Sequence, residues 1–373
     1  MSEPMSEPMS EPQSESLSEP MHDHAANKRL LAELLRRLSE SDGADIDTTL
    51  AEYCHPDAVW RVFHPFNDLH GNAEAAARLW APLRDAFPDW EARMAFMLAG
   101  EYEGRDCVSA WGVLMGNLSK SWLGIPPTHG LCTLRLGINA VVREGRIAKV
   151  YVLLDIVDLM RQAGHYPFRR MPGSAEAWAF PPCDSGATGE SVDAELGATT
   201  LAAVREMQLG LAKGDELKNL GATRSRHSPH WHRNMMWYGP AGIGSSRGQR
   251  GFLEYHGALF IQAFPDREGI ARDHAGPEDA PGHYIRLGDG HFAVTSGWPS
   301  LYGTHLGGQW LGLAPSGRRV EMRVADWYRT DRDGKIIDNW VMIDLLHILH
   351  QTGLDVLDDL RYFTDPARQR WPG

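Results

Sequence analysis

Residues 303–353 read GTHLGGQWLGLAPSGRRVEMRVADWYRTDRDGKIIDNWVMIDLLHILHQTG. The pattern predicts an extended segment and a loop, then a long strand, a tight turn, a second strand and a helix. The turn is indicated by the polar run Asp331-Arg332-Asp333-Gly334 between the two strand-like segments. We therefore expect a β-hairpin that leads directly into a closing helix.

Two carboxylates of this hairpin are candidates for acid/base chemistry. Because side chains alternate between the faces of a strand, one face of the second strand should carry Asp338, Trp340, Met342 and Asp344. In a simple hairpin Asp326 would lie across from about Trp340, which predicts Asp326 and Asp344 on the same face. Burial among aromatic and apolar neighbours favours the neutral carboxyl, which suits a general acid or base near neutral pH.

Several short pieces recur here in an order that is typical of one protein family. They are Gly303-Thr304-His305, 310–313, 315–320, 326–329, 333–336, and Asp344 ahead of Leu349 and Gly353, preceded by 237–240 and 263–266. With them the sequence resembles the SnoaL-like polyketide cyclase family, within the nuclear transport factor 2-like superfamily. The resemblance implies a curved antiparallel sheet wrapped around N-terminal helices into a cone with a deep pocket.

The chain repeats itself at long range. The matched pieces include AFPD at 86–89 and 263–266, WLG at 122–124 and 310–312, and Asp155 with Gly164 against Asp344 with Gly353. A period of this length indicates two whole domains rather than a solenoid. Each half begins with helices and continues with strands, which predicts an α+β fold of two tandem cone-shaped domains.

The domain limits follow from composition and from this repeat. The prediction is a disordered acidic tail over 1–25, a first domain over 26–165, a linker over 166–197, a second domain over 198–360 and a C-terminal tail over 361–373. The tail repeats Met-Ser-Glu-Pro and lacks the apolar surface that would offset the entropy of ordering it. Because single-domain relatives commonly dimerise, the resemblance implies an internal pseudo-dimer, with a homodimer as a further possibility.

The composition narrows the classes of function. A formal net charge of −12 over 373 residues argues against a nucleic-acid partner, which would require clustered Lys and Arg. The four cysteines form no Cys-x-x-Cys pair, which predicts a reducing compartment and no zinc knuckle. No signal peptide and no apolar run of about 18 residues are visible, so we expect a cytoplasmic protein without a membrane partner.

Asp344 is the first catalytic candidate. In the family that the sequence resembles, an acidic residue in the pocket acts as general acid/base during intramolecular aldol closure, and Asp344 stands at the recurrent late Asp. The alternative is a helix N-cap, because Asp is a favoured cap and Leu345 begins an apolar run. The first-domain counterpart, Asp155, has the same two interpretations, with more weight on the cap.

Asp326 and His305 would complete the catalytic set. Two carboxyl groups in one pocket would push their titrations apart and give one acid and one base. The alternative for Asp326 is a pair with Arg318, Arg319 or Arg323, and for His305 it is a structural, hydrogen-bonded histidine. The first half has Gly137 or Ile138 at the position of Asp326, so the second half is the better candidate for an active pocket.

Aromatic residues and further histidines are candidate pocket walls, although core packing is the alternative for each ring. The predicted substrate-binding residues are Trp237, Tyr238, Trp298, Tyr328, Trp340 and His232, and the first-domain counterparts are Trp122, His64 and Tyr151. Among His227, His230 and His232, the last two would face the same way on a strand, and His-x-His is a metal-ligand spacing. No third ligand is identifiable from the sequence, however, and the resemblance implies a fold that generally works without metal. We predict no metal site and no cofactor.

The leading hypothesis is a cofactor-independent enzyme that acts on a carbonyl-bearing hydrophobic small molecule. Asp344 would move a proton at the carbon alpha to the carbonyl, while His305 or Asp326 would stabilise the developing enolate. Aldol-type cyclisation is the reaction that gives the family its name, and dehydration, isomerisation or hydrolysis would use the same groups. The rival hypothesis is a non-catalytic small-molecule-binding or interaction protein.

Overall fold

The computed structural model describes residues 23–41, 43, 45–175, 192–212, 229–269, 282–308 and 310–364. The predicted acidic tail up to residue 22, residues 176–191 of the predicted linker, His227 and residues 365–373 lie outside this described part. We call the described residues up to 175 the first half and those from 192 onward the second half.

The first half begins with helices and ends with a run of strands. Its elements are α1 (His24–Glu40), α2 (Ile46–Tyr53), β1 (Cys54–Val62), β2 (Asn67–His70), α3 (Gly71–Ala75), the π-helix η1 (Ala76–Trp80), α4 (Ala81–Ala86), β3 (Glu91–Tyr102), β4 (Arg105–Asn117), β5 (Leu131–Arg143), β6 (Arg146–Leu154) and α5 (Ile156–Gln162). The strands form one sheet in the order β2-β1-β6-β5-β4-β3.

The second half repeats this succession. Its elements are α6 (Ala194–Ala212), β7 (Trp231–Tyr238), β8 (Ser246–Arg247), α8 (Gly248–Phe252), the π-helix η2 (Leu253–Gly257), α9 (Ala258–Ala263), β9 (Glu268–Gly269), β10 (His283–Asp289), β11 (Phe292–Thr304), the 3₁₀-helix η3 (Trp310–Gly312), β12 (Arg319–Thr330), β13 (Ile336–Ile343), α10 (Leu345–Thr352) and α11 (Val356–Thr364). The sheet order β8-β7-β13-β12-β11-β10 matches that of the first half, and β9 adds to β11.

The predicted α+β class is confirmed, with one correction to the sheets. Neither sheet is purely antiparallel, because β1 runs parallel to β6 and β7 runs parallel to β13. In each half the antiparallel run of later strands returns to the first strand and pairs with it in the same direction. Each sheet is therefore mixed, with one parallel pair beside its otherwise antiparallel ladder.

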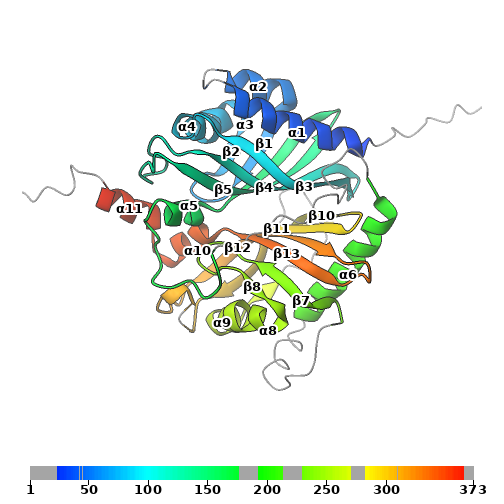
Figure 1. Ribbon diagram of the computed structural model, residues 1–373, viewed down its shortest axis with the longest axis vertical. Coiled ribbons are helices and arrows are strands. Elements are labelled where there is room, and N and C mark those ends of the chain that lie inside the picture. The colour runs from blue at the N-terminus through cyan, green and yellow to red at the C-terminus, as the bar shows by residue number, and fades with distance from the viewer. Residues whose placement is uncertain are drawn as a thin grey trace, which may run out of the picture.

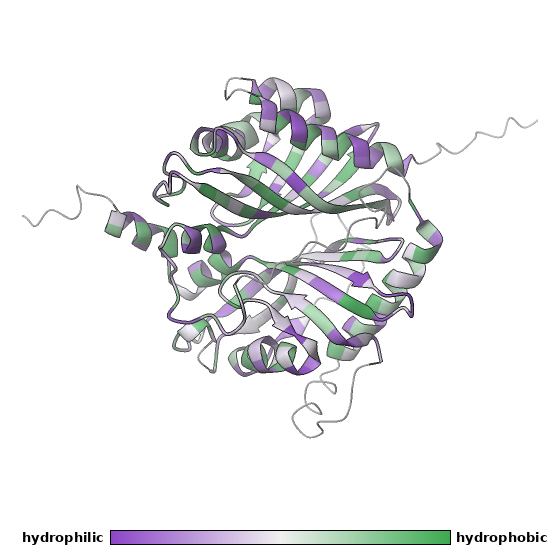
Figure 2. Cartoon of the chain, viewed as in Figure 1, coloured by the Kyte–Doolittle hydropathy of each residue, from purple (hydrophilic) through white to green (hydrophobic). Residues whose placement is uncertain are grey.

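The helices form where the sequence places apolar residues at helical spacing. In α1 the buried side chains include Leu31, Leu34, Leu35 and Leu38, which share one face of the helix. Asp23 caps this helix by accepting a 2.8 Å hydrogen bond from the backbone N–H of Ala26. Figure 2 shows hydrophobic and hydrophilic segments on the outer helices, as expected when one face packs on a sheet.

The helices lie on the outer sides of two sheets that face each other (Figure 1). Helices α1 to α4 cover one face of the first sheet, and α6, α8 and α9 cover one face of the second. The remaining faces meet in an aromatic layer to which both halves contribute, in which the rings of Tyr151 and Tyr284 stack with centroids 3.4 Å apart. None of the helices in the described ranges is long and apolar enough to cross a lipid bilayer.

One glycine shows how closely the two sheets approach. A Cβ atom built on Gly137 of β5 would lie 2.2 Å from the indole of Trp327 in β12. The same indole donates a 2.8 Å hydrogen bond to the hydroxyl of Ser109, and that hydroxyl donates in turn to Asn139 at 2.6 Å. The layer between the sheets is therefore specifically packed and hydrogen-bonded.

Candidate functional site

The register of the β12–β13 hairpin differs by one residue from the prediction. Trp327 pairs with Trp340, and Asp326 pairs with Val341. Because the side-chain period of a strand is two, this shift moves Asp326 to the face opposite Trp340 and Asp344. The prediction that Asp326 and Asp344 share one face was wrong: Asp326 faces the helices, whereas Trp340 faces the first sheet.

Asp344 has the contacts of a helix cap at the seam between the halves. Its Oδ1 accepts a 3.1 Å hydrogen bond from the N–H of His347, which caps α10. Its Oδ2 accepts from the N–H of His64 in the first half at 2.9 Å, and from Arg323 at 3.4 Å. Burial raises the pKa of Asp344 to about 6, while Arg323 and the two amides act in the opposite direction. These contacts favour the cap interpretation over proton transfer to a substrate.

Asp155 of the first half makes the equivalent set of contacts, and its contact across the seam is with the second half. It accepts from the N–H of Asp158 at 3.1 Å and from Arg135 at 2.7 Å. It also accepts a 2.9 Å hydrogen bond from the N–H of Ala241, which belongs to the second half. Each late Asp therefore binds an Arg of its own sheet, caps its own closing helix and holds a loop of the other half. We call these two sets of contacts the reciprocal lock.

A polar group lies instead on the helix-facing side of the second sheet. Asn339 of β13 donates to Asp326 at 3.4 Å, and the hydroxyl of Tyr328 is also hydrogen-bonded to this carboxyl. Gln208 of α6 donates to the hydroxyls of Tyr328 at 3.2 Å and of Thr295 at 2.7 Å. We call Gln208, Thr295, Asp326, Tyr328 and Asn339 the polar cluster.

Asp326 is the titratable centre of the polar cluster. Burial raises its pKa to about 7, although the hydrogen bonds from Asn339 and Tyr328 lower it. The residue is nevertheless only half-buried, so its surroundings do not close over it. A carboxyl with a pKa near neutrality exists in both protonation states and can serve as acid or base. The predicted alternative partners of Asp326 contact other groups: Arg318 donates to the carbonyl of Gln351, Arg319 pairs with Asp266 and Glu268, and Arg323 pairs with Asp344 and Glu321.

An aromatic row lies beside the polar cluster. From the end of α8 through η2 to the C-cap of α9, side chains at four-residue spacing are Phe252, His256, Phe260 and Phe264. The ring of His256 stacks on Trp237 with centroids 4.3 Å apart, and Trp237 pairs in register with Asn339 of the polar cluster. Burial lowers the pKa of His256 to about 4, so its imidazole is neutral at pH 7. We call these four side chains the aromatic row.

His305 stands at the far end of the aromatic row rather than in the polar cluster. Its ring packs on Phe264 with centroids 5.4 Å apart, and its Nδ1 accepts a 3.3 Å hydrogen bond from the N–H of Ser316. In the pairing of β11 with β12, Thr295 lies opposite Asp326, whereas Thr304 lies opposite Arg319. His305 is therefore separated from Asp326 by most of the strand, and burial lowers its pKa.

The predicted pocket walls divide between two locations. Trp237 and Tyr328 are on the helix-facing side with Asp326. Four other rings belong to the layer between the sheets, where they fill the core: Tyr151, Tyr238, Trp298 and Trp340. The alternation of side chains across β7, β11 and β13 is the reason, because neighbouring residues such as Trp237 and Tyr238 face opposite sides.

The remaining candidates lie apart from the polar cluster. Trp122 is buried in the first half, 6.1 Å from the ring of Phe66. His232 accepts a hydrogen bond from the N–H of Asn234, and His230 lies 3.9 Å from the carboxylate of Glu206. His64 lies at the seam, where burial lowers its pKa to about 4.

Sequence reasoning missed His256, Asn339, Gln208 and Thr295, although the repeat carried a signal for some of them. His256 lies eight residues after Gly248, which begins α8, as Leu79 lies eight residues after Gly71, which begins α3. Asn339 precedes Asp344 by five residues, as Val150 precedes Asp155. A polar residue in one copy against an aliphatic residue in the other marks these positions as special to the second half.

Comparison with known proteins supports the family that the sequence suggested. The model of the SnoaL-like polyketide cyclase family matches residues 295–352, which contain Asp326, Tyr328 and Asn339. A comparison with curated protein sequences finds no match.

Solved structures of single-domain length align with part of the chain. A protein from Jannaschia sp. CCS1, assigned as a SnoaL-like polyketide cyclase, is 19% identical over 40% of this chain and 99% of its own, with a TM-score of 0.34. IdmH from Streptomyces antibioticus is 24% identical over 36% of this chain and 96% of its own, with a TM-score of 0.31. Over residues 295–352, the chain is similar to the SnoaL-like polyketide cyclases, which confirms the family resemblance of its sequence.

Proposed function

We propose that the second half carries the working site of a SnoaL-like enzyme that performs acid/base chemistry on a hydrophobic, carbonyl-bearing small molecule. The observation that carries this proposal is Asp326, a half-buried carboxyl with a pKa of about 7 that contacts Tyr328 and Asn339. This combination of perturbed pKa and convergent polar groups is typical of catalytic sites. The segment that matches the family model contains all three residues.

The polar cluster supplies the groups that an aldol-type cyclisation needs. The carboxylate of Asp326 takes a proton from the carbon alpha to a carbonyl, and the electron pair moves to the carbonyl oxygen. The hydroxyl of Tyr328 or the amide of Asn339 donates a hydrogen bond to the resulting enolate oxygen. The enolate carbon then bonds to a second carbonyl carbon, and the protonated Asp326 returns its proton to the new alkoxide. Dehydration, isomerisation or hydrolysis would begin with the same groups.

The aromatic row supports a planar or polycyclic substrate. Its four rings stand at one-turn spacing from the end of α8 to the C-cap of α9, and Trp237 adds a fifth. Aromatic side chains favour stacking on flat apolar ligands. Phe252 and Phe260 are only partly buried, so their rings keep surface that a ligand could cover.

The two halves are proposed to be tandem copies, with domains over 26–165 and 198–360, that pack as an internal pseudo-dimer. In this view Asp344 and Asp155 join the copies through the reciprocal lock, and the first half is a scaffold. The proposed protein works in the cytoplasm without a cofactor, and the sequence expectation of a homodimer belongs to this proposal as well.

Hydrogen–deuterium exchange tests the reaction without knowledge of the product. A panel of β-dicarbonyl compounds is incubated with the protein in D₂O, and loss of the α-proton signal is followed by NMR. We expect exchange whose rate rises as pH passes about 7, where Asp326 becomes ionised. Asp326→Asn should slow exchange by about 10²–10⁴-fold, the usual contribution of general acid/base catalysis.

Matched variants separate this site from the alternatives. Asp344→Asn keeps a cap at α10 and should retain exchange, and Phe260→Leu should weaken substrate binding more than it changes the exchange step. Full exchange in Asp326→Asn would refute the assignment. Binding of the compounds without exchange in the unchanged protein would favour the non-catalytic rival.

A further inference from the structure

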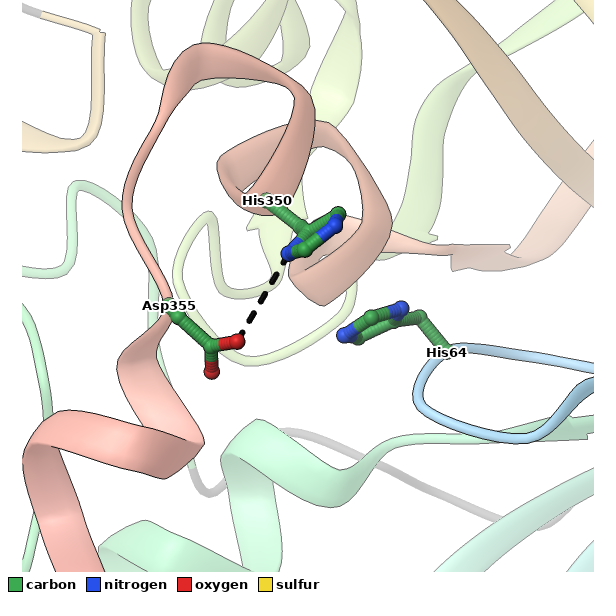
Figure 3. A group of neighbouring side chains, drawn as sticks. All are labelled: His64, His350 and Asp355. Atoms are coloured by element: carbon green, nitrogen blue, oxygen red, sulfur yellow. Dashed lines mark ion pairs between the residues drawn. The ribbon is translucent and has the colours of Figure 1, made fainter.

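A cluster of two histidines and one aspartate lies at the seam between the halves, away from the polar cluster. His64 comes from the loop after β1, His350 from the last turn of α10, and Asp355 from the residue before α11. One potential ligand atom from each residue lies within 4.8 Å of the other two. Figure 3 shows the three side chains converging on one point from these three segments.

The backbone around the cluster holds each side chain in place. The N–H of His64 is bound to Asp344 at 2.9 Å, so the reciprocal lock fixes the loop that carries this ring. Gly353, with φ of 94°, ends α10 and turns the chain so that His350 and Asp355 come together. Asp355 uses Oδ1 to accept from the N–H of Asp358 at 3.0 Å, and its Oδ2 lies 3.6 Å from Nδ1 of His350.

The cluster borders a small surface depression. The depression is lined by His64, Leu346, Leu354, Asp355, Val356 and Leu357 and is too shallow to enclose a water molecule. The rings of His64 and His350 stack with centroids 4.8 Å apart, and His350 and Asp355 are exposed. Because His350 and Asp355 are exposed, an ion could reach the ligand atoms from solvent.

The pseudo-equivalent seam lacks these ligand types. There the chain has Ala241 where the first half has His64, as their matching hydrogen bonds to Asp155 and Asp344 show. Arg161 precedes Gly164 by three residues as His350 precedes Gly353, and Tyr166 follows at the position of Asp355. The fold itself therefore does not require two imidazoles and a carboxylate at this place.

We infer that His64, His350 and Asp355 form a binding site for one divalent transition-metal ion. Two imidazoles and one carboxylate are a ligand set that zinc and the neighbouring first-row metals accept, and three protein ligands leave a position for water or a small anion. The ion would connect the first half to the α10–α11 pair across the seam. This site is separate from the proposed acid/base site and does not depend on it.

Titration calorimetry with Zn²⁺ tests the inference on the full-length, tag-free chain after treatment with a chelator. We expect one Zn²⁺ to bind per chain, and His350→Ala and Asp355→Asn to weaken this binding at least tenfold. Both residues are exposed, and Asn preserves the helix cap at position 355, so the variants should fold. His70→Ala removes an exposed histidine outside the cluster and is the matched control that should bind as the unchanged chain does.

A second measurement excludes binding elsewhere on the chain. Co²⁺ is added in place of Zn²⁺, and its visible absorption reports the coordinating groups. The absorption spectrum of the unchanged chain should be lost in His350→Ala and kept in His70→Ala. Absence of Zn²⁺ binding by the unchanged chain, or equal binding by the unchanged chain and both cluster variants, would overturn the inference.

Discussion

The two halves share one strand order, but the side chains between sheet and helices are aliphatic in the first half and largely polar in the second. On the helix-facing side, the first half has Leu79, Ala110, Ile138, Ala140 and Val150 where the second half has His256, Thr295, Asp326, Tyr328 and Asn339. These residues correspond because they keep the same spacing from shared positions: Ile138 follows Arg135 by three residues, as Asp326 follows Arg323. The same scaffold is thus filled with aliphatic side chains in one copy and with polar ones in the other.

The interiors also differ in how completely they are closed. Ala75, Leu83 and Leu136 of the first half are at most 1% exposed. Their counterparts Phe252, Phe260 and Val324 are only partly buried. The first half resembles a filled core, whereas the second keeps accessible surface around Asp326. The comparison teaches that the fold does not need a polar interior, so the polar cluster requires a functional explanation.

The largest effect is expected when the carboxyl of the second half is introduced at the matching position of the first half. Ile138→Asp would bury an unpaired carboxyl opposite Ala110 in the apolar core of the first half. We expect a loss of about 4 kcal/mol or more in the free energy of unfolding, measured by urea titration, because burial of an unpaired charge belongs to the most destabilising changes. A loss below about 1 kcal/mol would mean that the first interior also tolerates charge.

The reciprocal lock offers the next largest effect. Asp155→Ala would remove one of the two buried carboxylates that Arg135 contacts, leaving Asp158 at 3.3 Å, and would free the N–H of Ala241. We expect the free energy of unfolding to fall by about 2–4 kcal/mol, because several hydrogen bonds to a charged group are lost and each contributes about 1.5–3 kcal/mol. Asp344→Ala should act in the same direction through Arg323. If only one of the two variants destabilised the chain, the symmetry of the lock would be refuted.

Gly137 marks a second difference between the halves, in the layer between the two sheets. The corresponding residue of the second half is Ala325, whereas Gly137 lies under the indole of Trp327. Gly137→Ala should therefore cost about 1–3 kcal/mol of stability through overpacking, measured by thermal or urea unfolding. A neutral Gly137→Ala would show that the two sheets can separate slightly without loss.

Much of the fold was predictable because local sequence patterns indicate its elements, and these patterns occur in both halves. The leucines of α1, the turn at residues 331–334 and the repeated motifs indicated the elements and the α+β class. The site was harder to predict because one residue of register decides which face a side chain takes. That register depends on how Trp327 and Trp340 pack against the first sheet, which is a long-range contact.

The role of Asp344 shows the same limit. Sequence position could not separate a catalytic carboxyl from a cap, because both stand at the start of an apolar helix. The partner that decides between them, the N–H of His64, lies in the other half of the chain. By contrast, the difference between Leu79 and His256 or between Val150 and Asn339 was visible in the repeat itself, once the copies are aligned at their glycines and late aspartates.

The pH dependence of stability in Asp326→Asn tests the central claim most directly. Asp in an unfolded chain has a pKa of about 3.9, whereas folding raises that of Asp326 to about 7. Between these values the folded state holds a proton that the unfolded state releases, so rising pH destabilises the fold, fully so above pH 7. Asp326→Asn lacks this pH-dependent contribution to the free energy of unfolding. Ile138→Val is the control in the first half, and its stability relative to the unchanged chain should not vary with pH.

The stability of the unchanged chain minus that of Asp326→Asn is measured by urea unfolding between about pH 4 and pH 8. The account predicts that this difference falls by at least about 1 kcal/mol as pH rises to 7 and then levels off, since one pKa unit corresponds to about 1.4 kcal/mol. A difference that stays flat, or that increases with pH, would contradict a neutral-range carboxyl at residue 326 and with it the proposed acid/base site.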